Sequence, residues 1–259
     1  MSKYEWLAIR ETMDGRFRSA RLAQQFLEHA SKSRLIVDLG CGTGSNRRYL
    51  CRDCVSGVPW RCIDNDDEVL ETATHRSAGR PIRFEHVELA TDLLLIPIGG
   101  DVSITASAFL DITSEDWLSR FVKLAAQSPI LIAMTASGAP VWDPADDLDV
   151  AIGLCLEEHQ KSDHGFGPAA GAQAAPFLAD KLISRECNVT LEKSDWRLGS
   201  QDAEVLAMLV DSVCRRASSK MHREQVEHWA SMRQQQIRKG VLKLTLPHLD
   251  LLSLPRFDA

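Results

Sequence analysis

One short stretch of the sequence alternates glycine with other residues behind an acidic side chain. The stretch VDLGCGTGSN contains Asp38, Gly40, Gly42 and Gly44, and the apolar residues Leu35 and Ile36 precede it. Glycine permits φ > 0 and leaves no side chain between the backbone and a ligand. A flexible loop directly behind a stiff buried strand is therefore typical of a site where the backbone closely approaches a bound molecule.

Two further acids stand where the next two strands are expected to end. Asp64 ends the second predicted strand, twenty residues after Gly44, and Glu88 closes the third. A carboxylate at the position of Asp64 can accept hydrogen bonds from both ribose hydroxyls of an adenosine. Glu88 is in position to face an adenine edge. Together these features favour a ligand that contains a nucleoside.

The elements that must position these residues form a regular series in the first half of the chain. Strands are predicted within RLIVDLG, PWRCID, PIRFEHVEL, GDVSITASAFL and PILIAMTAS, and helices within SNRRYLCRD, DDEVLETATHR and SEDWLSRFVKLAAQ. Strands that alternate with helices at this spacing predict βαβ units and a parallel sheet. The fold class is therefore α/β, three-layered and doubly wound, preceded by one or two helices in residues 1–29.

The second half of the chain is less regular. Residues 138–172 form an insertion rich in Asp, Gly, Pro and Ala, with a helix in DDLDVAIGLCLEEHQ. Helices are predicted over 174–184 and 202–238, one strand in CNVTLEKSDWRL and a last strand in VLKLTLPHLDLLSLP. The two insertions, 138–172 and 202–240, are expected to build a substrate pocket.

Composition limits the classes of function. The chain has 259 residues, which suits one elaborated domain, and a net charge of -6, which weakly disfavours a protein that mainly binds nucleic acid. No apolar run approaches the ~20 residues that span a bilayer, so no membrane association is expected. The N-terminus lacks the apolar segment of a signal peptide, and a cytoplasmic location is the expectation.

The motifs resemble those of the class I S-adenosylmethionine-dependent methyltransferases. VDLGCGTGSN is similar to their motif Asp/Glu-x-Gly-x-Gly-x-Gly, and CIDNDDEVLETA looks like their second motif. VELATDL is similar to the segment that flanks adenine, and DVSITASAFLDI occupies the place after strand four. The resemblance covers roughly residues 30–135 and implies a Rossmann-like, mostly parallel seven-stranded sheet, with HLDLLSLP as its final strand.

The resemblance also implies S-adenosylmethionine as the cofactor and assigns residues to it. The glycine loop would line the methionine and ribose portion, with Asp38 orienting the amino group. Asp64 would hold the ribose. Arg16 or Arg18, on an N-terminal segment (1–29) expected to close over the cofactor, would pair with the methionine carboxylate. The implied cofactor-binding residues are Asp38, Gly40, Cys41, Gly42, Gly44, Asn46, Asp64, Asn65, Glu88, Leu89, Thr105, Ser107 and Arg18.

A dinucleotide-binding protein is the alternative interpretation of the glycine loop. Ser45 occupies the position of the third glycine of that pattern. Hydride transfer would also require an acid–base pair that the sequence does not identify. This alternative therefore ranks well below the first.

Candidate catalytic residues lie in the insertion, within EEHQKSDHGFGPAAG. His159, Asp163 and His164 stand there among glycines, and Phe166 could wall the pocket. Histidine titrates near neutrality and is the usual general base. The alternative is a solvated loop in which Gly and Pro make turns.

A metal site is a weaker possibility in the same part of the chain. Asp143, Asp146 and Asp147 could supply carboxylates to magnesium. However, Asp-Pro followed by acids more often starts a helix. No metal site is predicted.

The predicted function is methyl transfer to a small-molecule acceptor. In that family, an Asn/Asp-Pro-Pro-Tyr signature binds exocyclic or amide nitrogens, and a Pro-Cys or Thr-Cys nucleophile serves methylation of cytosine at C5. The loop TASAFLD has neither, which disfavours methylation of DNA or glutamine. The basic segment 214–240 leaves open an RNA methyltransferase. A non-catalytic protein that binds S-adenosylmethionine is the third possibility.

Overall fold

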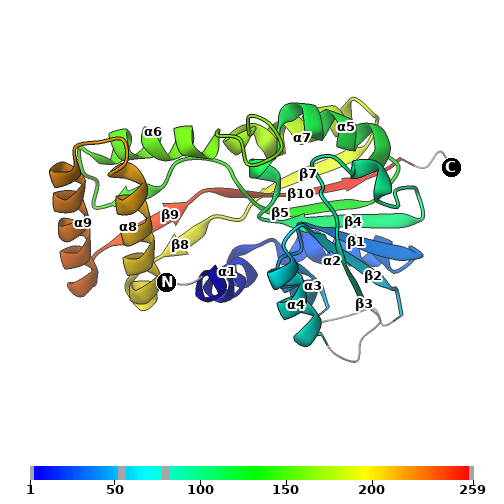
Figure 1. Cartoon of the computed structure of the whole chain (residues 1–259), viewed down its shortest axis with the longest axis horizontal. Helices are drawn as coiled ribbons and strands as arrows, with labels where there is room; N and C mark the ends of the chain where they lie inside the picture. The colour runs from blue at the N-terminus through cyan, green and yellow to red at the C-terminus, as the bar shows by residue number, and fades with distance from the viewer. Residues whose placement is uncertain (1–2, 52–56, 78–81, 257–259) are drawn as a thin grey trace.

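A seven-stranded sheet forms the centre of the protein (Figure 1). The structure is a computed structural model and describes residues 3–51, 57–77 and 82–256. The strand order is β3-β2-β1-β4-β5-β10-β7. Neighbours from β3 to β5 run parallel, whereas β10 is antiparallel to both β5 and β7. The strands are β1 (Leu35–Leu39), β2 (Trp60–Asp64), β3 (Ile82–His86), β4 (Val102–Ser107), β5 (Ile130–Ala136), β7 (Asn188–Lys193) and β10 (His248–Leu254).

Helices cover both faces of this sheet. α5 (Glu115–Ala125) and α7 (Ala174–Ile183) pack on one face through residues such as Trp117 and Leu178. α2 (Ala20–Ala30), α3 (Ser45–Leu50) and α4 (Asp67–His75) lie on the other, where Phe26 is fully buried. The prediction of a three-layer, mostly parallel α/β fold with seven strands is confirmed.

A second, three-stranded sheet was not predicted. It has the order β6-β9-β8, with β6 (Val141–Asp143), β9 (Lys243–Leu246) and β8 (Trp196–Leu198) all antiparallel to their neighbours. The prediction of a single strand in CNVTLEKSDWRL was wrong, because β7 and β8 belong to different sheets. The same is true of VLKLTLPHLDLLSLP, where Pro247 separates β9 from β10. Proline has no N–H to donate to a ladder, which suits a position between two sheets.

A second hydrophobic core forms around this smaller sheet. α1 (Lys3–Phe17), α6 (Asp149–Gln160), α8 (Ala203–Ala217) and α9 (Arg223–Arg238) surround buried Trp142, Trp196 and Trp229. Figure 1 shows α8 and α9 side by side, at the end of the molecule away from the main sheet. The two helices account for the predicted helical stretch 202–238, and β6 and α6 lie in the insertion 138–172.

Short 3-10 helices complete the described elements: η1 (Leu93–Leu95), η2 (Leu110–Ile112), η3 (Gly171–Gln173) and η4 (Ser200–Asp202). Within the described ranges, every helix is too short or too polar to cross a membrane.

Candidate cofactor and active site

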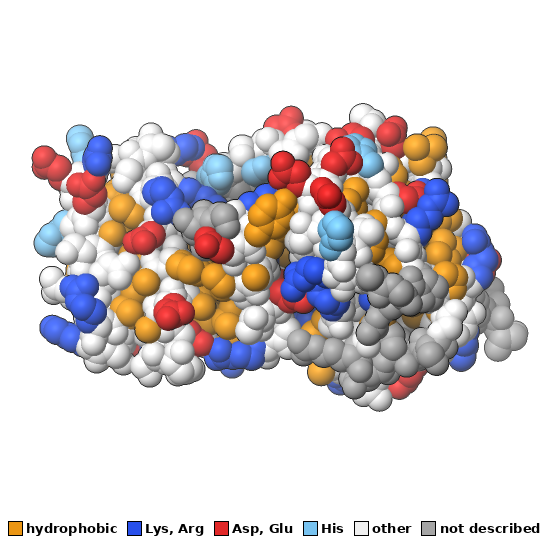
Figure 2. Space-filling view, turned by 60° about the horizontal axis from the view of Figure 1, so that its bottom comes forward, with side chains coloured by type: hydrophobic (Ala, Val, Ile, Leu, Met, Phe, Trp, Pro, Cys, Tyr) orange, Lys and Arg blue, Asp and Glu red, His pale blue; other side chains and the backbone are white. Residues whose placement is uncertain are grey.

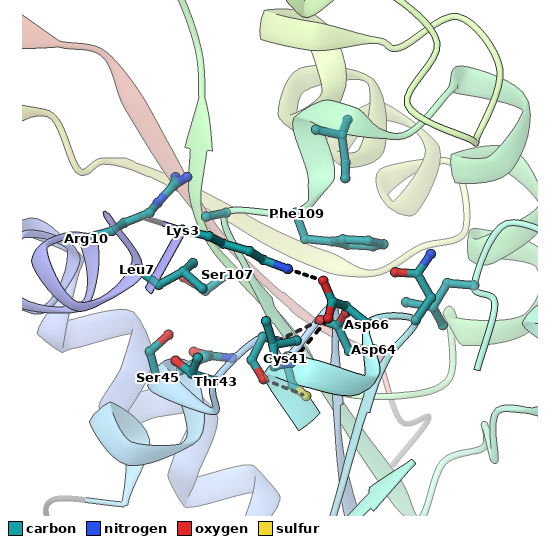
Figure 3. Close-up of a pocket in the computed structure, with 18 of the residues that line it drawn as sticks. Lys3, Leu7, Arg10, Cys41, Thr43, Ser45, Asp64, Asp66, Ser107 and Phe109 are labelled. Carbon is teal, nitrogen blue, oxygen red and sulfur yellow. Dashed lines mark hydrogen bonds and ion pairs between the residues drawn. The ribbon is translucent and has the colours of Figure 1, made fainter. Parts of the chain in front are cut away.

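A cavity of about 320 Å³ lies at the carboxyl ends of the parallel strands (Figure 3). Its walls come from the loop after β1, the end of β2, the segments after β3 and β4, and helix α1. β1 lies between β2 and β4 in the sheet, so the chain direction switches at this strand. Ligands of open α/β sheets bind at such switch points.

The glycine loop adopts a conformation that other residues rarely take. Gly40 and Gly42 have φ values of 60° and 50°. A Cβ on Gly40 would lie 2.5 Å from the Cδ2 atom of Phe109, whereas a Cβ on Gly42 would meet no atom within 4 Å. Both glycines line the cavity. The loop therefore packs tightly against Phe109 on one side and leaves its backbone open to the cavity on the other.

Asp64 fixes the shape of this loop from the end of the next strand. Its Oδ2 accepts a hydrogen bond from the backbone N–H of Gly42 at 2.8 Å, and its Oδ1 accepts one from the N–H of Asp66 at 3.1 Å. Burial raises the pKa of Asp64, and the backbone donors partly offset this effect. The carboxylate lines the cavity and retains lone pairs for further donors.

The third wall follows β3 and is part polar, part apolar. β3 ends at His86, so Glu88 lies two residues beyond the strand rather than closing it. Asn65 donates to Oε2 of Glu88 at 3.0 Å. Leu89 is buried, and its carbonyl accepts a hydrogen bond from Nε1 of Trp117 at 2.7 Å. The wall thus combines a fixed carboxylate with an apolar surface.

Three residues expected to touch the cofactor form a buried network behind the wall. Asn46 lines the cavity and donates to Oδ1 of Asp38 at 2.7 Å and to Oγ1 of Thr105 at 3.1 Å. Arg18 donates to Oδ1 of Asn46 at 2.9 Å. Asp38, Thr105 and Arg18 are buried and do not line the cavity, so they reach it only through Asn46. Burial raises the pKa of Asp38 to about 7. Gly44, also outside the lining, precedes α3 as its N-cap residue.

Helix α1 supplies one side of the cavity, with residues that were not predicted from the sequence. Its contribution is Lys3, Leu7, Arg10, Glu11 and Asp14. Glu11 accepts two hydrogen bonds of 2.7 Å from Arg48 of α3, which ties α1 to the core. Lys3 pairs with Asp66 across the cavity in Figure 3. Arg16, the other arginine expected near the methionine end, instead pairs with Asp202 at 2.6 Å.

Comparison with known proteins gives similarity at the level of fold. No protein-family profile matches the sequence, and no curated protein matches it either. The structure of the YcgJ protein of Bacillus subtilis is similar with a TM-score of 0.51 and 12% identity, over 92% of this chain and 100% of that chain.

Two other solved structures are similar at TM-scores of 0.46. Geranyl diphosphate C-methyltransferase of Streptomyces coelicolor A3(2) is 11% identical, over 91% of this chain and 79% of its own. The cyclopropane synthase MmaA2 of Mycobacterium tuberculosis is 11% identical, over 89% and 83%. Identities this low leave the strand order as the deciding observation: five parallel strands, then an antiparallel strand inserted before the edge strand. The chain has the class I methyltransferase fold.

In this methyltransferase fold, the insertion after β5 brings one predicted catalytic histidine to the cavity. His164 and Phe166 line it, together with Ser107 at the end of β4 and Phe109 just beyond it. His159 is exposed near the end of α6, its ring 6.1 Å from that of His164, and does not line the cavity. Burial and the charge of Arg216 lower the pKa of His159.

Asp163 has a local structural contact instead. Its Oδ1 accepts hydrogen bonds from the N–H groups of Gly165 and Gly167, at 2.7 and 3.0 Å. It is exposed and does not line the cavity. Of the three predicted catalytic residues, the structure brings only His164 to the cavity of the methyltransferase fold.

Two of the three acids considered as magnesium ligands, Asp143 and Asp146, have local structural contacts. Asp143 pairs with Lys243 at 3.2 Å, and Oδ1 of Asp146 accepts the N–H of Leu148 at 2.9 Å just before α6. In the parts of the chain that the structure describes, no group of three or more His, Cys, Asp or Glu side chains is arranged to hold a metal ion.

Proposed function

We propose that the protein binds S-adenosylmethionine in this cavity and transfers the methyl group to a small-molecule acceptor. The observation that carries the proposal is the juxtaposition of Asp64 with the open backbone of Gly42, 2.8 Å apart at the switch point of the sheet. A carboxylate and an unobstructed backbone at one wall fit the ribose of an adenosine. The volume of about 320 Å³ lies within the range of small-molecule sites.

The residues fit the cofactor along the length of the cavity. Asp64 would accept hydrogen bonds from the ribose hydroxyls, and Glu88 with Leu89 would flank adenine. Gly40 and Ser107 would lie beside the methionine portion, where Asn46 offers a polar group held by its buried partners. When bound, S-adenosylmethionine supplies a methyl group already activated on a sulfonium.

The chain must then orient the acceptor and exclude water. Helix α1 lies over the cavity. It is tied to the core through Glu11, and through Lys3 to Asp66, the N-cap residue of α4. We propose that α1 closes the site when the cofactor is bound, as expected for the segment 1–29. His164, at the rim, is the residue of the predicted catalytic set that can reach an acceptor.

Substitution of Asp64 tests the cofactor assignment. We expect Asp64→Asn to weaken S-adenosylmethionine by about 2 kcal/mol, or roughly 30-fold in Kd, because charge-assisted hydrogen bonds to the ribose are lost. Calorimetric titration measures this, with Asp101→Asn as the control, since Asp101 forms only a surface pair with Arg34. Equal affinities of Asp64→Asn and wild type would contradict the assignment of Asp64 to the ribose.

Transfer itself is tested with labelled cofactor. The purified protein is incubated with methyl-tritiated S-adenosylmethionine and a cell extract, which is then separated into small-molecule, RNA and protein fractions. Label that appears in the small-molecule fraction and survives RNase supports the proposal. Cofactor binding without label in any fraction would instead support the non-catalytic alternative.

No structural observation favours the RNA alternative. In the basic segment 214–240, Arg233 is fully buried, Lys220 pairs with Glu158 at 2.7 Å, and Arg223 pairs with Glu227 at 2.6 Å. On the face shown in Figure 2, Lys and Arg side chains are interspersed with Asp and Glu. A phosphate backbone requires a continuous basic footprint.

A further inference from the structure

An arginine and an aspartate of α1 form an ion pair in the cavity wall. Nε of Arg10 donates to Oδ2 of Asp14 at 3.2 Å, and Nε1 of Trp196 donates to Oδ1 of Asp14 at 3.0 Å. Their side chains are 27% and 13% exposed. Both residues line the cavity, so the pair is held on one side by α1 and β8 and presented to the interior on the other.

The pair retains unused hydrogen-bonding capacity. Among the described residues, the two terminal nitrogens of Arg10 make no hydrogen bond, and each oxygen of Asp14 accepts only one. A partly buried ion pair loses solvation that its own attraction does not fully return. A pair of this kind that faces a cavity is well suited to recognise a ligand carrying opposite charges.

The guanidinium of Arg10 extends away from the glycine loop, into the part of the cavity that we assign to the acceptor. In Figure 3, Arg10 points away from Thr43 and Ser45. Burial and the charge of Arg10 both lower the pKa of His248, which begins β10. Burial raises the pKa of Asp111, and the charge of Arg10 opposes this effect. Asp111 follows β4 and His248 begins β10, so the guanidinium is near the carboxyl end of β4 and the start of β10.

Asp111 lies within the electrostatic influence of Arg10 but does not line the cavity. Gln160 donates to its Oδ2 at 3.3 Å, but its Oδ1 is enclosed and has no partner among the described residues. An enclosed carboxylate oxygen without a donor is rare, and a ligand or water commonly satisfies it. Two carboxylates therefore lie near the guanidinium of Arg10, and of these only Asp14 lines the cavity.

We propose, on the basis of the proposed function, that the Arg10–Asp14 pair binds an acceptor of the α-amino-acid type. The two terminal N–H groups of arginine match a carboxylate bidentately, and the carboxylate of Asp14 accepts N–H groups of the amine. In an α-amino acid both groups are attached to one carbon, which matches two protein groups 3.2 Å apart. Burial raises the pKa of Asp14, which suits a carboxylate that takes a proton from the acceptor nitrogen.

The methionine portion of the cofactor has the same chemistry as this acceptor, so the test separates the two. S-adenosylhomocysteine carries the amino-acid group, whereas 5′-methylthioadenosine does not. If the pair serves the acceptor, Arg10→Gln and Asp14→Asn leave the affinity for both compounds unchanged. If Arg10→Gln weakens S-adenosylhomocysteine and leaves methylthioadenosine unaffected, the pair serves the cofactor, and the proposal is overturned.

The acceptor is tested by thermal shift on the full chain saturated with S-adenosylhomocysteine. Each of the common α-amino acids is added at about 10 mM. At this concentration, a ligand with a Kd of about 1 mM stabilises the folded protein by about 1.4 kcal/mol. We expect at least one amino acid to raise Tm, and acetate or methylamine, each with only one of the charges, to have no effect. Arg10→Gln, Arg10→Lys and Asp14→Asn should each weaken the binding at least tenfold.

Asp202→Asn is the matched control. It loosens α1 at Arg16 without altering the cavity lining, and it should retain amino-acid binding. Absence of any stabilising amino acid in the complex overturns the proposal. Failure of S-adenosylhomocysteine itself to bind would instead contradict the proposed function, so the two failures are distinguishable. Near-UV circular dichroism verifies that each variant is folded.

Discussion

At the scale of single residues, two glycines of one loop have different surroundings and should respond differently to the same change. Gly40→Ala places a methyl group 2.5 Å from a ring carbon of Phe109, whereas Gly42→Ala meets nothing within 4 Å. Both acquire the strain of positive φ, about 1–2 kcal/mol. Overpacking should cost Gly40→Ala a further 1–3 kcal/mol, roughly. Urea denaturation measures the free energy of unfolding of both variants.

A second substitution, at Phe109, tests whether packing causes the stability loss of Gly40→Ala. Phe109→Leu should recover part of the loss in Gly40→Ala, because a smaller side chain makes room for the methyl group. Gly42→Ala should instead weaken cofactor binding, since its methyl group enters the cavity. Equal stability losses in the two alanine variants, with no rescue, would contradict this explanation.

His248 should make stability depend on pH. Burial lowers its pKa to about 4, and its Nδ1 lies 2.9 Å from the carbonyl of Leu246, so Nδ1 carries the proton in the neutral ring. The unfolded chain binds a proton near pH 6.5, and the folded chain does not until about pH 4. The free energy of unfolding should therefore fall as pH falls from 6.5 to 4, by up to about 3 kcal/mol.

The comparison is between wild type and His248→Gln, by urea denaturation at pH 7 and pH 4.5. Glutamine does not titrate, so the difference in unfolding free energy between the two proteins should shrink or reverse at the lower pH. A difference that is the same at both values would show that His248 titrates alike in the folded and unfolded chains.

Asp38 should make stability depend on pH in the opposite direction to His248. Burial raises its pKa to about 7, so between pH 4 and 7 the folded chain holds a proton that the unfolded chain has lost. Stability from this group falls as pH rises through that range. Asp38→Asn should therefore gain stability relative to wild type between pH 5 and pH 8, by about 1–3 kcal/mol. Denaturation at both pH values measures the gain, and no change between them would contradict it.

Sequence position was sufficient for the acids that follow strands but not for the cavity wall as a whole. Asp64 and Glu88 could be placed because the carboxyl ends of parallel strands share one edge of the sheet. The resemblance to the methyltransferase family placed Asp38 and Thr105 at the cofactor, but their side chains are covered by Asn46. Arg10 and Asp14 were missed, since the sequence of a charged helix does not show what its polar face contacts.

At the scale of elements, the strand pairings of the second half could not be predicted from periodicity. The alternation in KLTLPHLDLLSL continues on both sides of Pro247, so the sequence shows one pattern where the structure has β9 and β10 in two sheets. Alternation reports which face of a strand is buried, not which strand is its neighbour. Helices α8 and α9 were predictable because their pattern is local.

One buried arginine should account for much of the attachment of α9. Arg233 donates to Oδ1 of Asp149 at 2.5 Å and to the carbonyl of Pro144 at 2.6 Å, and its guanidinium lies 5.3 and 5.4 Å from the rings of Trp142 and Trp229. Removal of one partner of a buried pair costs about 3–5 kcal/mol. We expect this loss for Arg233→Ala in urea denaturation.

The matched control, Arg238, is the last residue of the same helix. Arg238 is exposed, and Arg238→Ala should change the unfolding free energy by no more than about 0.5 kcal/mol. Similar effects of both variants would mean that helix propensity, rather than the buried contacts of Arg233, determines the stability of α9.

At the scale of the whole molecule, the two hydrophobic cores are joined by short, ordered connections. Only residues 194–195 separate β7 from β8, and only Pro247 separates β9 from β10. Helix α1 belongs to both parts, since Met13 is in the second core and Glu11 pairs with Arg48 of α3. The cavity lies where these parts meet, with walls from both α1 and the strand ends.

Such connections predict that the two cores unfold together. Trp117 reports on the main core and Trp229 on the second, and the six tryptophans can be followed separately by ¹⁹F NMR after 5-fluorotryptophan labelling. We expect coincident urea midpoints for both signals. Because α1 links both cores to the cavity, S-adenosylhomocysteine should shift the two midpoints upward by the same amount. Separate midpoints, or a shift confined to Trp117, would mean that the smaller sheet and its helices fold as an independent domain.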